Sequence, residues 1–372
     1  KYKIALPAPA LYGQFNNLDD INIILNALPS LGFDAVFEVS KAAELISEVT
    51  RLYLEKKNPP KPAISSACPA VVRLIRVCFP ELIDNIILVN APVEEAGRLA
   101  RNKAVAKTGL KPEEIGVFFI SPCPAKITSF KQPMGTDKSN VDGAIAINDI
   151  YPHLLKAMEK MSEHDEMMAL HESGVIGIGW ATSGGEASGT LKDNALAADG
   201  IENCIRVLDQ IDSADITNLD FVELNACSGG CVGGAMTVAN PYIAQARLQS
   251  LKRYLPVAPN RPKESDWIPD EYFHEKKVEY NPYSSLSSDR KTAMRMMHQI
   301  EQIHKILPGL DCGSCGAPTC MAFAEDIVKC EAGADECTVM LKRLMKERGI
   351  ETEREELLAR FEQIIQENHQ DG

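Results

Sequence analysis

Short apolar runs alternate with longer amphipathic stretches over about the first 250 residues of the chain. Apolar runs too short for helices predict strands over Lys3–Leu6, Ala35–Glu38, Ala63–Ser65, Ile86–Leu88, Ile115–Ile120, Gly143–Ala146, Val175–Ile178 and Phe221–Leu224. Helical spacing of apolar positions predicts helices over Asp20–Leu28, Lys41–Glu55, Ala70–Val77, Pro92–Thr108, Ile147–Lys160, Glu186–Ala198 and Pro241–Leu251. Because strands alternate with helices, we expect an α/β fold with largely parallel sheets flanked by helices.

The pattern changes after residue 255. Residues 256–290 are rich in Pro, Ser, Asp and Tyr and predict an extended linker. A helix is expected over Lys291–Ile306. A second helix is expected from Glu351 to about Asn368, at the tail of the chain, with one apolar face suited to packing or homodimerisation. We therefore expect one domain over residues 1–255 and a small helical domain over residues 291–372.

Composition and charge exclude several classes of protein. The 372 residues, 45% hydrophobic and 24% charged, are typical of a soluble globular chain of two or three domains. A net charge of −13 argues against a nucleic-acid partner, and no apolar run approaches the roughly 18 residues of a membrane span. The start at Lys1 shows no signal segment and already predicts a core strand, so we expect the natural chain to extend upstream.

Eleven cysteines point to chemistry. Most cluster beside Gly and Pro, which in a large acidic chain is more typical of metal ligands or catalytic groups than of disulfides, and we expect a reducing, cytoplasmic location. Loops after three predicted strands carry the thiols of Cys68, Cys123, and the pair Cys227 and Cys231. Ligands usually bind at such carboxyl ends of strands. Cys78 and Cys204 lie on apolar helical stretches and are expected to be buried structural thiols.

The C-terminal block places three thiols within nine residues, at Cys312, Cys315 and Cys320. A [4Fe–4S] cluster takes four thiolates, and Cys337 is the expected fourth. Zinc is the alternative, although zinc sites usually use two paired knuckles. The block resembles the four-cysteine cluster module of electron-bifurcating complexes and corrinoid iron–sulfur proteins. This resemblance implies a [4Fe–4S] electron relay and leaves Cys330, which stands where a glycine is common, as a spare thiol.

The three loops of the larger domain resemble the signature loops of the iron-only ([FeFe]) hydrogenase catalytic domain. The family patterns are Thr-Ser-Cys-Cys-Pro, Met-Pro-Cys-x-x-Lys and Ala-Cys-x-Gly-Gly-Cys, which correspond here to Ser65–Pro69, Ser121–Lys126 and Ala226–Cys231. Ala8–Ala10 and Ala181–Ala187 also match, and the resemblance spans about residues 3–250. It implies a two-lobed hydrogenase-like domain that holds an H-cluster, in which a [4Fe–4S] cube is joined through one cysteine to a two-iron unit.

The resemblance also assigns roles to residues of this chain. Four thiols would hold the cube: Cys68, Cys123, Cys227 and Cys231. Of these, Cys231 would bridge to the two-iron unit. Lys126 matches the lysine that donates to a cyanide ligand, and Pro9 and Ala10 match the loop packed around the other cyanide.

Departures from the family pattern bear on rate. Ala67 stands where active members place a proton-carrying cysteine, and Ser121 replaces a methionine that packs against the bridging carbonyl. The family's pair of glutamates in the proton path is also reduced, with Glu48 as one acid out of phase. A general acid or base is commonly worth roughly 10²–10⁴-fold, so we expect slow turnover, which is typical of the family's sensory members.

Two classes of function follow from the resemblance. The first is a sensory, low-activity hydrogenase with H2 and protons as substrates, a redox or signalling partner, and H-cluster maturation proteins. The alternative is a non-catalytic protein in which the same cysteines hold a cube without the two-iron unit, acting in electron transfer or in cluster assembly.

Overall fold

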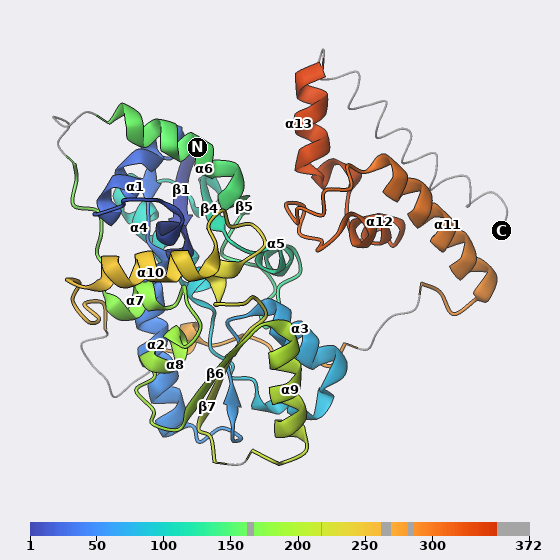
Figure 1. The fold of residues 1–372 in the computed structure, drawn as a ribbon, viewed down its shortest axis with the longest axis horizontal. Coiled ribbons are helices and arrows are strands. Elements are labelled where there is room, and N and C mark those ends of the chain that lie inside the picture. The colour runs from blue at the N-terminus through green and yellow to red at the C-terminus, as the bar shows by residue number, and fades with distance from the viewer. Residues whose placement is uncertain (162–166, 217, 262–268, 282–285, 348–372) are drawn as a thin grey trace. The chain divides into compact units, whose positions relative to one another are not determined.

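The computed structural model describes residues 1–161, 167–216, 218–261, 269–281 and 286–347. The chain divides into two compact units, Lys1–Asn281 and Pro282–Gly372 (Figure 1). This boundary lies later than the expected domain end at residue 255. Residues 269–281 pack on the first unit, where the backbone N–H of His274 donates to the carbonyl of Leu88 and Val278 is buried in the core. The expected linker over residues 256–290 therefore belongs in part to the first unit.

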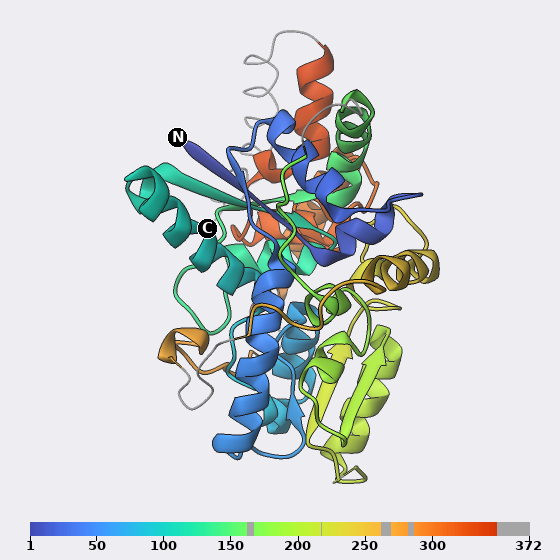
Figure 2. The same cartoon turned by 90° about the vertical axis from the view of Figure 1, so that its left-hand side faces the viewer.

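The first unit contains two parallel sheets in separate lobes, as Figures 1 and 2 show. The four-stranded sheet has the order β2-β1-β4-β5, with β1 (Tyr2–Pro7), β2 (Ala35–Val36), β4 (Ile115–Ser121) and β5 (Gly143–Ala146). The three-stranded sheet has the order β3-β7-β6, with β3 (Ala63–Ile64), β6 (Ala195–Asp199) and β7 (Phe221–Asn225). Every strand pair is parallel. The predicted two-lobed α/β architecture is confirmed.

Helices flank both sheets. They are α1 (Ile21–Ala27), α2 (Val39–Lys56), α3 (Pro69–Cys78), α4 (Pro92–Thr108), α5 (Pro124–Lys131), α6 (Ile147–Lys160), α7 (Val175–Gly179), α8 (Gly185–Gly189), α9 (Ile201–Asp212) and α10 (Pro241–Lys252). Proline at the first position starts α3, α4, α5 and α10, where its missing N–H costs no hydrogen bond. Short 3₁₀ turns connect the elements, among them η1 (Pro9–Gln14), η5 (Cys231–Gly233) and η6 (Asp270–Tyr272).

Three predicted elements are wrong. The strand expected over Ile86–Leu88 is reduced to an isolated parallel bridge between Ile86 and Ile64. The strand expected over Val175–Ile178 is the short helix α7, which lies against α2 so closely that a Cβ on Gly177 would meet the carbonyl oxygen of Ser40 at 2.2 Å. Tertiary packing therefore overrides the β-branched sequence. The helix expected over Glu186–Ala198 ends early at α8, because the chain turns at Leu191 (φ +56°) and then enters β6.

The second unit is helical where the structure describes it, as expected. Its helices are α11 (Arg290–Ile306), α12 (Cys320–Val328) and α13 (Thr338–Glu347). Asp289 caps α11 by accepting from the backbone N–H of Thr292, and Thr319 caps α12 by accepting from the N–H of Ala322. Ile303 and Phe323 lie in the small core that α11 and α12 share. The tail helix expected from Glu351 lies outside the described residues.

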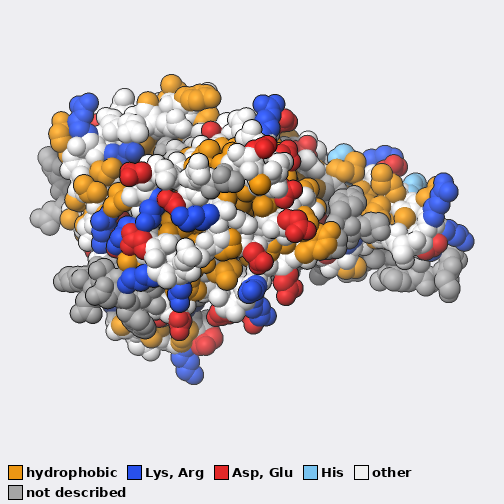
Figure 3. Space-filling view, turned by 90° about the horizontal axis from the view of Figure 1, so that it is seen from below, with side chains coloured by type: hydrophobic (Ala, Val, Ile, Leu, Met, Phe, Trp, Pro, Cys, Tyr) orange, Lys and Arg blue, Asp and Glu red, His pale blue; other side chains and the backbone are white. Residues whose placement is uncertain are grey.

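The surface shows no segregation of charge on the face drawn in Figure 3, where acidic and basic side chains are interspersed among apolar ones. Within the part of the chain that the structure describes, no helix is both long and apolar enough to cross a membrane.

Candidate functional site

The four thiols predicted from the hydrogenase-like loops line one cavity of the first unit, of about 80 Å³. They are Cys68, Cys123, Cys227 and Cys231. Strand β3 leads to Cys68, β4 leads to Cys123, and β7 leads to the loop with the other two. Because β4 belongs to one sheet and β3 and β7 to the other, the cavity lies where the two lobes meet. The parallel topology therefore brings together thiols that are far apart in the sequence.

Cys68 and Cys123 each lie at the start of a helix. Each is the N-cap residue of the helix that follows it, α3 or α5. The backbone N–H groups of Ala125 and Lys126 favour the thiolate of Cys123 and oppose the rise of its pKa on burial. The positive ends of two helix dipoles thus face the cavity, which favours anionic sulfur or an anionic cofactor.

The third loop closes on its neighbours through backbone. Gly230 has φ +85°, and a Cβ there would meet the backbone nitrogen of Ser183 at 2.5 Å, so this position requires glycine. Two loop amides also donate to other segments: Val232 N–H to the Ala181 carbonyl at 3.0 Å and Met236 N–H to the Pro122 carbonyl at 3.1 Å. The loop is therefore fixed against both of its partner segments.

Burial dominates the acidity of the thiols. It raises the pKa of Cys227 and of Cys231 to about 12 and also raises the pKa of Cys123, while the Lys126 charge opposes the rise at Cys123 and Cys231. A metal that binds here must displace the thiol protons. Its positive charge then stabilises the thiolates that burial disfavours. Among the described residues, no three His, Cys, Asp or Glu side chains are arranged as ligands of a single metal ion. The donor set, four half-buried soft thiols framed by backbone amides and glycine, fits an iron–sulfur cofactor.

Other predicted site residues lie at the same cavity, namely Pro9, Ala10, Ala67 and Lys126. The ammonium of Lys126 donates to the carbonyl of Ala67 at 3.1 Å. Ser121 differs from expectation because it is not among the lining residues. Its hydroxyl donates to the Cys123 carbonyl at 2.9 Å and accepts from the Cys123 N–H at 3.1 Å, so it shapes the second loop instead of forming a wall.

Two buried glutamates at the cavity were missed by the sequence reasoning. Glu186 and Glu223 both line it. Burial, with a smaller contribution from the neighbouring Glu223, raises the pKa of Glu186 to about 8, and burial also raises the pKa of Glu223. Glu186 accepts from the Ser65 hydroxyl at 2.6 Å, and that hydroxyl accepts from the backbone N–H of Ala67 at 3.1 Å.

The chain carried a signal for each of these carboxyls. Glu223 is a charged residue inside the apolar strand Phe221–Asn225, where an acid needs a special reason to be buried. Glu186 follows Gly184 and Gly185 in a segment already matched to the family, but it is expected only as the first residue of the helix over Glu186–Ala198. Glu223 accepts from the N–H groups of Gly184 and Ala187, which holds the two carboxyls near one another.

The cysteine nest of the second unit consists of Cys312, Cys315, Cys320 and Cys337. Burial raises the pKa of Cys315 and of Cys337, and charge on Cys312 raises both further. Charge on Cys320 also raises the pKa of Cys337, so the four thiols lie within electrostatic range of one another. Cys330 is exposed just beyond α12 at φ +60°. As for the remaining thiols, Cys204 is buried as predicted, whereas Cys78 is exposed at the end of α3 and that prediction was wrong.

Comparison with known families identifies the first unit. Residues 1–195 and 155–235 match the family described as "Iron only hydrogenase large subunit, C-terminal domain", and residues 307–339 match an Fe-S cluster family. The chain belongs to the iron-only hydrogenase family. The suspected family and the fold class are therefore confirmed, while the roles assigned to single residues stay predictions.

Curated relatives of this hydrogenase-family chain are distant and differ in function. Iron hydrogenase 1 of Clostridium pasteurianum is 24% identical over 292 residues, which are 65% of this chain and 51% of that protein. The "Probable cytosolic Fe-S cluster assembly factor oxy-4" of Caenorhabditis elegans is 24% identical over 301 residues, 66% of this chain and 64% of that protein. The chain thus spans about half to two thirds of the length of these relatives.

Solved hydrogenase structures share the fold. One structure, from a study of oxygen inactivation of [FeFe]-hydrogenase, has a TM-score of 0.58 at 17% identity, covering 76% of this chain and 95% of that one. An apo [FeFe]-hydrogenase from Chlamydomonas reinhardtii has a TM-score of 0.57 at 17% identity with the same coverage. At such identity the likeness establishes the hydrogenase fold alone.

Proposed function

We propose that this chain is a low-activity [FeFe]-hydrogenase that interconverts H2 with protons and electrons and serves a sensory or regulatory role. The observation that carries the proposal is the thiol-lined cavity, which has four half-buried thiols and a lysine, with a methyl group at Ala67 where a proton carrier is expected. The residues proposed to hold the cofactor are thus all present, while a part of the expected proton path is missing.

Within the proposal, four thiols hold the cube: Cys68, Cys123, Cys227 and Cys231. Cys231 would be the thiol that links the cube to a two-iron unit. The bound group would supply the redox-active iron at which the H–H bond is made or broken. Lys126 contributes a fixed ammonium donor in a site with little water, where a charge-assisted hydrogen bond is strong. Pro9 and Ala10 pack along the wall, and both are buried, so they exclude water from it.

The carboxyls of Glu186 and Glu223 at the thiol cavity supply protons in place of the missing thiol. With a pKa of about 8, Glu186 is protonated at neutral pH and exchanges its proton close to physiological conditions. The Ser65 hydroxyl connects Glu186 to the backbone beside Ala67. A route that depends on such a buried carboxyl pair, without a thiol, supports slow turnover.

The second unit would relay electrons. We propose that Cys312, Cys315, Cys320 and Cys337 hold a second [4Fe–4S] cluster, which passes electrons to a redox or signalling protein in the cytoplasm. This ligand set is supported by the short range over which these thiols act on one another's pKa values. Maturation proteins would assemble the two-iron unit, and the chain would form a homodimer.

Hydrogen evolution tests the proposed activity. The full chain, matured with the two-iron cofactor and reduced with dithionite, should evolve H2 slowly but above a matched Cys231→Ala preparation. A fully loaded chain that evolves no more H2 than this variant would exclude hydrogenase turnover.

The likeness to a cluster assembly factor supports a second candidate, a cube-holding protein without the two-iron unit. The same four thiols serve both candidates, so the ligands alone do not discriminate between them. Retention of the cube without any uptake of the two-iron cofactor during maturation would favour this second candidate.

A further inference from the structure

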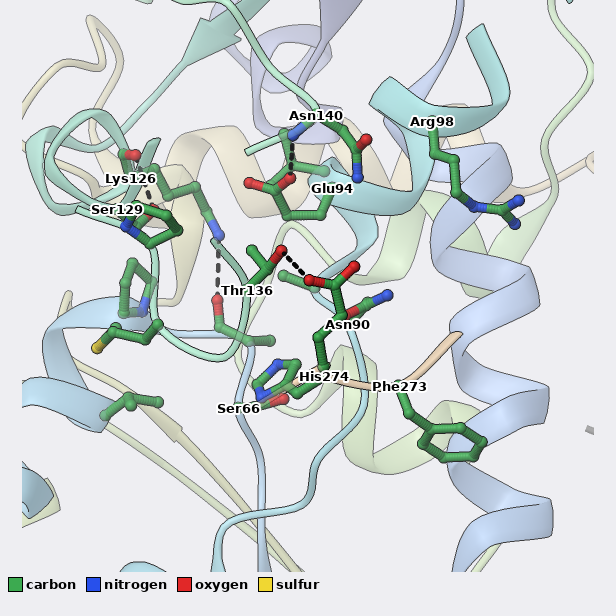
Figure 4. Close-up of a pocket in the computed structure, with 18 of the residues that line it drawn as sticks. Ser66, Asn90, Glu94, Arg98, Lys126, Ser129, Thr136, Asn140, Phe273 and His274 are labelled. Carbon is green, nitrogen blue, oxygen red and sulfur yellow. Dashed lines mark hydrogen bonds between the residues drawn. The ribbon is translucent and has the colours of Figure 1, made fainter. Parts of the chain in front are cut away.

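A second cavity, of about 240 Å³, adjoins the thiol-lined cavity (Figure 4). We call it the polar chamber. It is lined by parts of α3, α4 and α5 and by residues 270–275. The two cavities have four lining residues in common: Ala67, Pro69, Val93 and Lys126. These four residues therefore form a wall shared by the two cavities, and they include the alanine that replaces the expected proton carrier.

Polar groups converge in the chamber, and the main ones are Asn90, Glu94, Thr136, Asn140 and His274. Such a lining, with this volume, accommodates several water molecules with hydrogen-bonding partners. Burial lowers the pKa of His274 to about 4, so the ring is neutral, and its buried Nδ1 lacks a partner among the described residues. That nitrogen is an acceptor for a water in the chamber.

Glu94 is a half-buried acid in the lining of the chamber. Its carboxylate accepts from the Ser139 hydroxyl at 2.6 Å and from the backbone N–H of Asn140 at 2.7 Å. Burial raises its pKa, and the charge of Lys126 opposes that rise. Figure 4 shows the Glu94 carboxylate and the Lys126 ammonium pointing into the same space.

Lys126 lies within electrostatic range of two carboxyls. Its charge acts on Glu94, which lines the chamber, and on Glu186, which lines the thiol cavity. Proton-exchanging groups thus lie on both sides of the shared wall. Glu186 is itself fully buried from solvent, so it needs a path by which protons arrive.

Other charged groups around Glu94 have partners of their own. Arg98 pairs with Glu95 and Glu271, and the carboxylate of Glu275 accepts from the Thr136 hydroxyl at 3.1 Å. Asp270 also belongs to the lining. Glu94, with Lys126 facing it, is thus the acid best placed to exchange protons with water inside the chamber.

We propose that the polar chamber is the solvent-side half of the proton route to the thiol cavity, with Glu94 as the group that binds and releases protons there. This inference rests on the proposed function. The Glu94 carboxylate takes a proton from hydronium in the chamber, leaving water, and then gives that proton to a water at the Ala67–Lys126 wall, which regenerates the carboxylate. No electron moves in either step.

A pH-jump experiment on the matured full chain tests this route. Time-resolved infrared spectroscopy would follow the protonated-carboxyl band of Glu186, identified as the band that Glu186→Gln removes. Glu94→Gln keeps an acceptor for Ser139 and Asn140 but carries no exchangeable acid proton, so the Glu186 band should respond at least ~10-fold more slowly. Glu94→Asp should restore part of the rate.

Glu44→Gln is the matched control, because burial raises the pKa of the Glu44 carboxyl as it does that of Glu94, yet Glu44 lines neither cavity. It should leave the response of the Glu186 band unchanged. An unchanged response in Glu94→Gln, or an equal slowing in Glu44→Gln, would overturn the proposal. Because the band reports proton arrival and not H2 turnover, a chain that evolves no H2 refutes the proposed function without deciding this test.

Discussion

The two cysteine sites of this chain are assembled in opposite ways. The nest of the second unit draws its four thiols from residues 312–337, within one loop–helix–loop segment. The thiol cavity of the first unit takes its thiols from Cys68 to Cys231, at the ends of strands in two sheets. The first arrangement is local and the second depends on the whole fold.

The difference extends to what surrounds the thiols. The thiol cavity has a fixed ammonium, two buried carboxyls and an adjoining polar chamber. The nest has a small apolar core around it, with Phe323, Ala324 and Ile327. An electron relay needs no more than such insulation, whereas proton chemistry needs titratable groups with shifted pKa values. The surroundings therefore separate a proposed catalytic centre from a proposed relay.

Removing the bridging thiol should break the comparison most completely. Cys231→Ala should abolish the infrared bands of the two-iron unit after maturation, because no other thiol of the cavity is expected to link it. Iron in the second unit should persist, as measured by iron analysis and electron paramagnetic resonance. The exposed Cys78→Ala is the control and should keep every band. Full bands in Cys231→Ala would show that the bridge is misassigned.

Removing one thiol of the nest tests the local site. Cys337→Ala should lose the second cluster, because a [4Fe–4S] cube needs four thiolates and Cys337 is buried beside the others. The exposed Cys330→Ala should keep its full iron content. If iron is unchanged in the first variant and lost in the second, Cys330 is the fourth ligand.

Restoring the missing proton carrier should separate the contribution of the cofactor ligands from that of the proton path. Ala67→Cys places a thiol on the wall shared by the two cavities and should raise H2 evolution of the matured chain by at least ~10-fold. Ala67→Ser is the matched control of similar size. No gain over the unmodified chain would mean that proton delivery at this wall does not limit turnover.

A smaller effect should appear in the pH dependence of stability. Folding raises the pKa of Glu186 from an ordinary 4.5 to about 8, so between these values the folded chain binds a proton that the unfolded chain releases. The free energy of unfolding of the unloaded chain should therefore fall as pH rises through this window.

Glu186→Gln should flatten that slope, as measured by urea unfolding at several pH values. Glu202→Gln, at an exposed position on α9, should leave the slope as it is. Equal slopes in the unmodified chain and in Glu186→Gln would contradict the raised pKa.

Much of this molecule can be predicted from its sequence where the signals are local. The bounds of α4 and α6 agree with the predicted helices because Pro92, Gly109 and the helical apolar spacing mark them. Loops rich in cysteine, glycine and proline directly indicate the thiol positions. The resemblance then supplied the family, which no composition or spacing could have done.

Features that depend on tertiary contact were not predictable in the same way. The segment at Val175 has strand-like residues but is helical, because it packs on α2. Glu186 and Glu223 read as ordinary acids until the fold buries them together. The polar chamber is formed by residues as distant in sequence as Ser66 and Glu275, and the local sequence around neither residue predicts it.

The central claim is that the thiol cavity holds an H-cluster type of cofactor. Infrared spectroscopy of the full chain after maturation with the two-iron cofactor tests it most directly. CO and cyanide bands should be present in the unmodified chain and absent from Cys231→Ala. A chain that carries its iron–sulfur iron yet shows no CO or cyanide bands would contradict it.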